Sequence, residues 1–252
     1  AEVYTYTAGS VVLGLCVGVF IGFFTPAGCA YAPNAHKGFC LYSAALPLGM
    51  MAFFLKAVLY TMRGVALPPA AAGFVAQPVV FYGSSITQGG CASRPGNAYQ
   101  AMVSRALQID FVNLGFSGSC KGEQAMADYL ASLPMSAFVC GYDHNAPTLA
   151  HLERTHLPLV QAVREGHPDI PIVLFGRPKA ALNAEEQARR KVIENTCAAV
   201  NGILIPNEAL IPPQISPWAT VDGVHPNDLG FYHMAKSIAD RLACLFGKES
   251  CL

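Results

Sequence analysis

The chain has 252 residues, of which 53% are hydrophobic and only 13% are charged. Sixteen basic residues balance sixteen acidic ones, so no net field would attract nucleic acid or an anionic membrane surface. The nine cysteines form no Cys-x-x-Cys pair and no close Cys/His cluster, which argues against a zinc site or a redox motif. Their odd number and even spread favour reduced, buried thiols and therefore a reducing, cytoplasmic compartment.

The charged residues divide the chain into two parts of different character. Only four of the first 78 residues are charged: Glu2, Lys37, Lys56 and Arg63. Residues 67–78 are rich in small residues and proline, which is typical of a connector. We therefore expect an accessory module at residues 1–77 and a second domain at residues 78–252.

The first part contains two apolar stretches, residues 11–24 and 40–60, that are long enough to raise the question of membrane spans. No Lys or Arg precedes position 37, so the positive flank of a signal or anchor is missing, and Pro47 and Lys56 interrupt the second stretch. Recurrent glycines among Val, Phe and Tyr residues suit short strands broken by turns. The pattern favours a β-rich module, such as a small β-sandwich, and membrane-associated helices remain the alternative.

Strand-like and helix-like segments alternate in the second part. Short apolar runs predict strands at residues 78–82, 110–114, 137–141, 170–175 and 203–206. Helices are predicted at residues 98–108, 123–131, 149–165, 184–200 and 227–246. This alternation predicts an α/β fold of three layers, in which a doubly wound, parallel, five-stranded sheet is covered on both faces. Ligands of such sheets bind beyond the carboxyl ends of the strands.

Ser85 follows the first predicted strand, in the run Gly-Ser-Ser-Ile-Thr-Gln-Gly at residues 83–89. A glycine-flanked turn at this place would expose the hydroxyl group and direct the neighbouring backbone amides toward a bound oxygen. On its own, the run is more typical of an ordinary serine turn or a helix N-cap, because turns rich in Gly and Ser are common. Taken alone, it therefore does not identify a nucleophile.

Asp222 and His225 stand three residues apart, just before the last predicted helix. A histidine is the usual side chain for proton transfer near neutral pH, and a neighbouring carboxylate orients its ring and stabilises its charged form. The alternative is a plain loop in which Asp222 and Gly223 form a turn and Pro226 starts the helix. With Ser85, these residues complete a set of nucleophile, base and orienting acid.

Gly118 follows the second predicted strand, and Asn145 follows the third. A tetrahedral oxyanion needs two or three fixed hydrogen-bond donors, and the Gly118 amide, the Asn145 side chain and the Ser85 amide would supply them. Without Ser85 and His225, we would interpret Gly118 as a tight turn and Asn145 as a turn cap.

Three further groups of polar residues are weaker candidates. Arg94 lies shortly after Ser85 and would bind a substrate oxygen or remain a solvated loop charge. Arg177 and Lys179, after the fourth strand, have the same two interpretations. His144, beside Asp143, would form a second acid/base pair, although a structural hydrogen bond is the favoured interpretation.

These blocks, in this order, resemble the SGNH (GDSL-like) hydrolase superfamily, across about residues 78–245. The resemblance implies a flavodoxin-like catalytic domain and assigns Ser85 as nucleophile, Gly118 and Asn145 as oxyanion residues, and Asp222 with His225 as the Asp-x-x-His block. The sequence around these residues is similar to that of a bacterial subgroup in which a small β-sandwich precedes the catalytic domain. Two departures are Ser84, where the family has Asp, and Ala146, where many relatives have Asp.

The resemblance implies a serine esterase that hydrolyses small O-acyl esters through an acyl-enzyme, with acetyl groups on a sugar or glycoside as the expected substrate. We expect no metal or organic cofactor, no nucleic-acid partner, and a small-molecule or glycan ester as the ligand. One alternative is an O-acyltransferase that uses the same residues. Another is a noncatalytic glycan-binding protein with a relict site, in which Ser85 would lie out of reach of His225.

Overall fold

A computed structural model describes residues 77–248 of the chain. The prediction of a β-rich or membrane-associated module therefore falls almost wholly outside the described residues. Within residues 77–248, no helix combines the length and the apolar character that crossing a membrane requires.

The described part is built on one sheet of five parallel strands in the order β2-β1-β3-β4-β5. The strands are β1 (Val79–Gly83), β2 (Phe111–Gly115), β3 (Ala137–Gly141), β4 (Ile172–Phe175) and β5 (Ile203–Ile205). The central strand β1 pairs with β2 on one side and with β3 on the other. This order is that of a doubly wound sheet, so the predicted fold class is confirmed.

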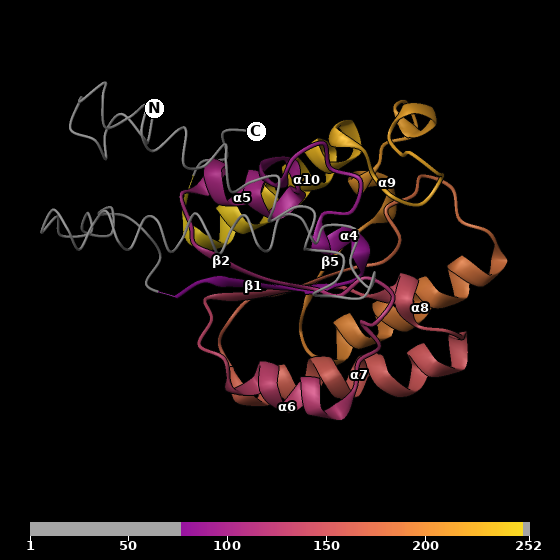
Figure 1. Cartoon of the computed structure of the whole chain (residues 1–252). Coiled ribbons are helices and arrows are strands. Elements are labelled where there is room, and N and C mark those ends of the chain that lie inside the picture. Colours follow the sequence, from indigo (N-terminus) through magenta and orange to yellow (C-terminus); the bar gives the residue numbers. More distant parts are fainter. Residues whose placement is uncertain (1–76, 249–252) are drawn as a thin grey trace, which may run out of the picture. The chain divides into compact units, whose positions relative to one another are not determined.

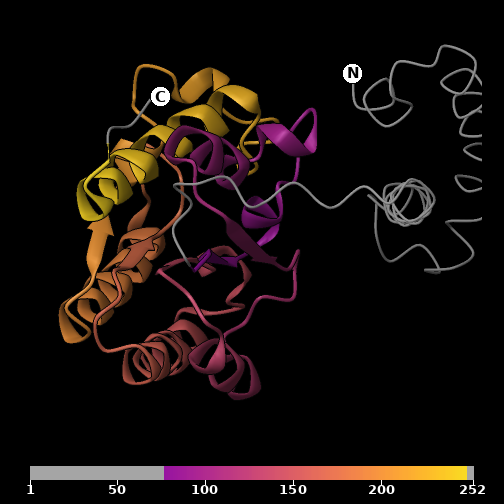
Figure 2. The ribbon, with the colours of Figure 1, turned by 90° about the vertical axis from the view of Figure 1, so that its left-hand side faces the viewer.

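Helices follow the strands and cover both faces of the sheet (Figure 1). They are α4 (Ser85–Gln88), α5 (Tyr99–Leu107), α6 (Gln124–Ser132), α7 (Leu149–Gly166), α8 (Ala184–Ala199), α9 (Asn207–Leu210) and α10 (Asp228–Phe246). Three single turns of 3-10 helix are η1 (Pro95–Asn97), η2 (Asp143–Asn145) and η3 (Ser216–Trp218). Helices α5 and α10 lie on one face, and α6, α7 and α8 lie on the other, as the view turned by 90° also shows (Figure 2).

Two apolar cores result from the alternation of side chains along each strand. In β1, Val79 and Phe81 face the core that contains α5 and α10, whereas Val80 and Tyr82 face the core of α6, α7 and α8. Because a parallel strand in this position is buried on both faces, β1 is a continuous apolar run that alternation cannot reveal in the sequence. Its residues Val79–Tyr82 are at most 1% exposed.

Side chains at the helix starts fix where the long helices begin. The Thr148 hydroxyl accepts a hydrogen bond from the His151 amide at the start of α7. At the start of α8, Asn183 and Glu186 form a reciprocal capping box. The five predicted strands and five predicted helices are confirmed with boundaries that differ by at most two residues, whereas α4 and α9 were not predicted.

The prediction of buried thiols is correct for three of the five cysteines in the described part of the chain. Cys120, Cys140 and Cys197 are buried, whereas Cys91 and Cys244 are exposed. Burial raises the pKa of the Cys120 and Cys140 thiols, because the low-dielectric interior disfavours the thiolate. These two thiols are therefore packing groups and not nucleophiles.

Candidate active site

Ser85 is the first residue of α4, directly after the end of β1. Ser84 forms the N-cap of this four-residue helix, and its Oγ accepts a hydrogen bond of 3.3 Å from the Ile86 amide. The helix ends at Gly89, whose φ of 95° lies in the left-handed region that glycine tolerates. The Ser85 hydroxyl is thereby held at the carboxyl end of the central strand.

The structure shows what Ser84, one departure from the family pattern, does in this chain. Its side chain is fully buried, and its hydroxyl serves as the helix cap that an aspartate also provides. The substitution therefore keeps the capping hydrogen bond and removes a negative charge beside Ser85.

Asp222 and His225 lie in a tight loop closed by a short antiparallel bridge. Thr220 pairs with Pro226, and the Val221 amide donates to the His225 carbonyl oxygen at 2.9 Å. Gly223 has a φ of 81°, so the turn between the two side chains needs the left-handed conformation. The loop folds Asp222 back onto the ring of His225.

Two hydrogen bonds join Ser85, His225 and Asp222 in a row. The Ser85 Oγ lies 2.8 Å from His225 Nε2, although the two residues are 140 positions apart in the sequence. The other ring nitrogen, His225 Nδ1, lies 2.7 Å from Asp222 Oδ2. An ionised carboxylate can only accept a hydrogen bond, so Nδ1 carries the hydrogen and Nε2 is left as the acceptor for the serine hydroxyl.

The Asp222 carboxylate is strongly hydrogen-bonded even though its side chain is 50% exposed. Its Oδ1 accepts from the amides of His225, at 2.7 Å, and Val224, at 2.9 Å. These bonds, first of all the one from the His225 amide, hold the pKa of Asp222 well below its usual range. The carboxylate is therefore charged throughout the neutral pH range.

Gly118 and Asn145 follow the two strands that flank β1. In the sheet register, Gly83 of β1 pairs with Gly115 of β2 and Gly141 of β3, so the three strands end side by side. The Asn145 Nδ2 donates to the Phe116 carbonyl oxygen at 2.8 Å, and the Ser117 amide donates to Gln88 Oε1 at 3.0 Å. These bonds tie the loop of Gly118 to the turn of Asn145 and to α4.

Arg94 is exposed, and its Nε donates to Asn97 Oδ1 at 3.0 Å within its own loop. That loop is anchored on Asp228, the first residue of α10, which accepts from the Ser93 amide at 2.9 Å and from Asn97 Nδ2 at 2.7 Å. Neither contact reaches Ser85 or His225, so the role of Arg94 toward a substrate stays a prediction. Asp228 was missed in the sequence, and its only signal was an acid directly after the N-cap of the last helix.

His144 and Asp143 do not pair with each other. Asp143 forms ion pairs with Arg177 and Arg189, which lie on other elements. Burial, followed by the charge of Arg177, lowers the pKa of His144 to about 4. His144 is therefore neutral at neutral pH. The ion pairs of Asp143 with Arg177 and Arg189 take the place of the expected contact between Asp143 and His144.

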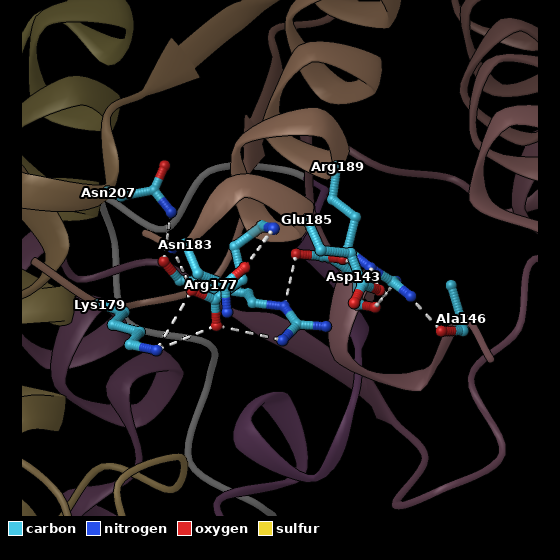
Figure 3. Close-up of polar contacts among 9 residues, drawn as sticks. Asp143, Ala146, Arg177, Lys179, Asn183, Glu185, Arg189 and Asn207 are labelled. Carbon is cyan, nitrogen blue, oxygen red and sulfur yellow. Dashed lines mark hydrogen bonds and ion pairs between the residues drawn. The ribbon is translucent and has the colours of Figure 1, made fainter. Parts of the chain in front are cut away.

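Arg177 and Lys179 are held in ion pairs with Glu186 of α8, at 3.4 and 3.0 Å (Figure 3). Their charges are therefore balanced within the protein. Among the residues described, no three His, Cys, Asp or Glu side chains gather where they could hold a metal ion.

The parallel sheet and the row of Ser85, His225 and Asp222 define a class, that of α/β proteins of the SGNH hydrolase type. The chain belongs to the GDSL-like lipase/acylhydrolase family, whose family model matches residues 76–243. None of the curated proteins matches the sequence.

Solved structures with the same fold include a GDSL-like lipase from Bacteroides ovatus, with 30% identity and a TM-score of 0.62. The match covers 71% of this chain and 56% of that one. Salicylyl-acyltransferase SsfX3 from a tetracycline biosynthetic pathway is 21% identical, with a TM-score of 0.59 and coverage of 68% and 56%. A two-domain esterase active on acetylated mannans is 24% identical, with a TM-score of 0.55 and coverage of 78% and 55%. This chain thus spans little more than half the length of these proteins.

Proposed function

We propose that the protein is a serine esterase that hydrolyses small O-acyl esters, with O-acetyl groups on carbohydrates as its substrates. The observation that carries the proposal is the row of two short hydrogen bonds, 2.8 Å from Ser85 Oγ to His225 Nε2 and 2.7 Å from His225 Nδ1 to Asp222 Oδ2. A structural serine does not need a histidine oriented toward its hydroxyl by a carboxylate, whereas a nucleophilic serine does.

In the proposed reaction, His225 Nε2 takes the proton of the Ser85 hydroxyl while Oγ attacks the ester carbonyl carbon. Asp222 stabilises the imidazolium that forms. The carbonyl oxygen becomes an oxyanion, and the Ser85 amide, the Gly118 amide and the Asn145 side chain are its proposed donors. His225 then protonates the leaving alcohol, which leaves the acyl group on Ser85.

The second half of the reaction repeats the same steps with water. His225 takes a proton from water, the hydroxide attacks the acyl carbon, and the proton passes to Ser85 Oγ as the carboxylic acid leaves. The imidazole returns to its neutral form and Ser85 regains its hydroxyl group, so the cycle closes with these residues and water alone.

The proposed carbohydrate substrate is supported by the similarity in fold to the esterase that is active on acetylated mannans. The charge balance points the same way, because Arg177, Lys179 and Arg189 are paired with carboxylates and offer no net attraction to an anionic substrate. A neutral glycan ester satisfies this condition.

A series of p-nitrophenyl esters from acetate to octanoate tests the activity and the acyl length. We expect acetate to be the best substrate, and we expect Ser85→Ala and His225→Ala each to lower kcat by at least ~10³-fold. A serine-directed inhibitor should label Ser85, which mass mapping of the labelled peptide would detect. Undiminished turnover in either variant would rule out the mechanism. Acetate release from acetylated mannan, compared with release from acetylated xylan, tests the carbohydrate.

An O-acyltransferase is the second candidate, because large apolar side chains are exposed in and just before the loop that carries the acid and the base. Trp218 is 66% exposed, Val221 is 64% exposed and Val224 is 41% exposed. An apolar surface near the acyl-enzyme favours an acceptor alcohol over water. Product analysis with candidate alcohols distinguishes the two reactions, since a transferase forms a new ester and a hydrolase forms free acid.

A further inference from the structure

A buried ion pair connects α8 to the turn that carries Asn145. Arg189 of α8 and Asp143 of η2 are each only 3% exposed, and Arg189 Nη1 lies 3.2 Å from Asp143 Oδ1. Arg177 approaches the second carboxylate oxygen, with its Nε 3.1 Å from Asp143 Oδ2 (Figure 3). The Asp143 carboxylate is thus held between two guanidinium groups.

Arg189 also binds the backbone at both ends of this turn. Its Nη1 donates to the carbonyl oxygen of Asp143 at 3.2 Å and to that of Ala146 at 3.1 Å. These two residues bracket His144 and Asn145 in the chain. One planar side chain therefore fixes the position of the whole turn relative to α8 (Figure 3).

Stability alone is a weak reason for this arrangement. Removing two charges from water is costly, and buried ion pairs can often be replaced by apolar side chains without loss of stability. What such a pair does provide is a defined geometry, because a guanidinium group binds its acceptors in fixed directions. Asn145 needs such a geometry if its amide is to meet an oxyanion, since a small displacement of a donor greatly weakens its effect.

We propose that Arg189 and Asp143 are positioning residues for Asn145, and that they hold its Nδ2 group in the direction required for oxyanion binding. The proposal rests on the proposed esterase function. It adds a residue of α8 whose polar contacts are with Glu185, Asp143 and Ala146 and not with Ser85, His225 or Asp222. It also accounts for an ion pair that the proposed reaction does not use.

A double-mutant cycle with Asn145 tests the proposal in the full chain, with p-nitrophenyl acetate as substrate. We expect Asn145→Ala to lower kcat about 10²-fold and Arg189→Met to lower it about 10- to 100-fold, with little change in KM. In the Asn145→Ala background, Arg189→Met should lower kcat by less than about 3-fold, because the donor it positions is gone. Equal losses in the two backgrounds would show that Arg189 acts independently of Asn145 and would overturn the proposal.

Arg190 provides the matched control, because it is the next residue of the same helix and also pairs with carboxylates, Glu194 at 3.0 Å and Glu208 at 3.5 Å. Arg190→Met should leave kcat unchanged. If Arg189→Met does not fold, Asp143→Leu combined with Arg189→Met removes both charges together. We expect this double variant to fold and still lose kcat, and wild-type kcat in the folded double variant would overturn the proposal.

A second readout separates this proposal from the proposed function. The side-chain amide of Asn145 gives its own NMR signals, and its hydrogen bond to the Phe116 carbonyl slows exchange of one hydrogen with solvent. In Arg189→Met we expect faster exchange and shifted signals, and in Arg190→Met we expect wild-type signals. If wild-type protein hydrolyses no ester, the function fails, and this measurement still decides the positioning role. Unchanged Asn145 signals in Arg189→Met would refute it.

Discussion

At the scale of single residues, the candidate site combines an exposed acid with a strongly fixed charge. Asp222 is half exposed, and water would normally screen its effect on the neighbouring imidazole. Three hydrogen bonds from Val224 and His225 instead hold its two oxygens in place. Orientation of the ring, and not burial of the carboxylate, is therefore the contribution we assign to Asp222.

Asp222→Asn tests that assignment. The amide side chain can donate to His225 Nδ1, which would place the hydrogen on Nε2 and remove the acceptor for the Ser85 proton. We expect kcat for p-nitrophenyl acetate to fall about 10³- to 10⁴-fold with little change in KM. Because the pKa of Asp222 is far below neutral, its carboxylate stays charged between pH 6 and 8. The ratio of wild-type kcat to variant kcat should therefore be the same at both pH values. A loss of less than 10-fold would contradict the assigned role.

The residues of the site could be predicted from the sequence because each stands beside a strong local signal. Ser85, Gly118 and Asn145 follow apolar strands, and Asp222 with His225 precede a helix, so the fold alone brings them to one edge. The structure places Ser85, His225 and Asp222 in contact, and their chemical roles stay predictions. The ion pair of Asp143 and Arg189 had no such signal, because the partners are 46 positions apart and charged residues are usually exposed.

At the scale of elements, α4 depends on its neighbours more than on its own sequence. Four residues are too few for a stable isolated helix or for a visible apolar period, which is why the sequence did not predict it. Two glycines allow it to pack against the sheet. A Cβ atom at Gly115 would lie 2.5 Å from the Cα of Gln88, and one at Gly83 would meet the Thr87 side chain. The ends of β1 and β2 can therefore pack against α4 only because positions 83 and 115 carry no side chain.

Gly115→Ala tests this close fit. The added methyl group must displace the backbone of α4, and Ser85 with it, so we expect kcat to fall about 10-fold or more and the protein to lose roughly 1–3 kcal/mol of stability. Both are measured on one preparation by ester hydrolysis and urea unfolding. Gly96→Ala is the control, because the nearest atom to its added Cβ would be the flexible end of Arg105 at 3.4 Å. Similar losses in the two variants would contradict the argument.

At the scale of the whole molecule, two histidines are held neutral inside the fold. His156 of α7 is fully buried, its Nδ1 lies 2.9 Å from Thr196 Oγ1 of α8, and its ring stacks on Tyr142. Burial lowers the pKa of His156 to about 4, and the pKa of His144 is lowered to the same value. The unfolded chain, by contrast, takes up these protons near the ordinary pKa of 6.5.

Stability should therefore decline as the pH falls from 6.5 toward 4, since only the unfolded chain binds these protons in that range. Each histidine contributes a loss of about 3 kcal/mol over the full interval. Urea unfolding at a series of pH values measures the decline. His156→Gln keeps a hydrogen-bonding group for Thr196 without a titrating ring, and it should make the decline shallower. An identical pH dependence in His156→Gln and wild type would contradict this prediction.

The order of Ser85 and His225 in the chain has a consequence for biosynthesis. The nucleophile leaves the ribosome 140 residues before the base with which it makes contact, and the base must await the packing of α10. At translation rates of 5–20 residues per second, this delay is roughly 7–30 s. A nascent chain therefore presents a serine turn without reactivity, and a serine-directed inhibitor applied to stalled translation intermediates would label only those in which the last helix has emerged.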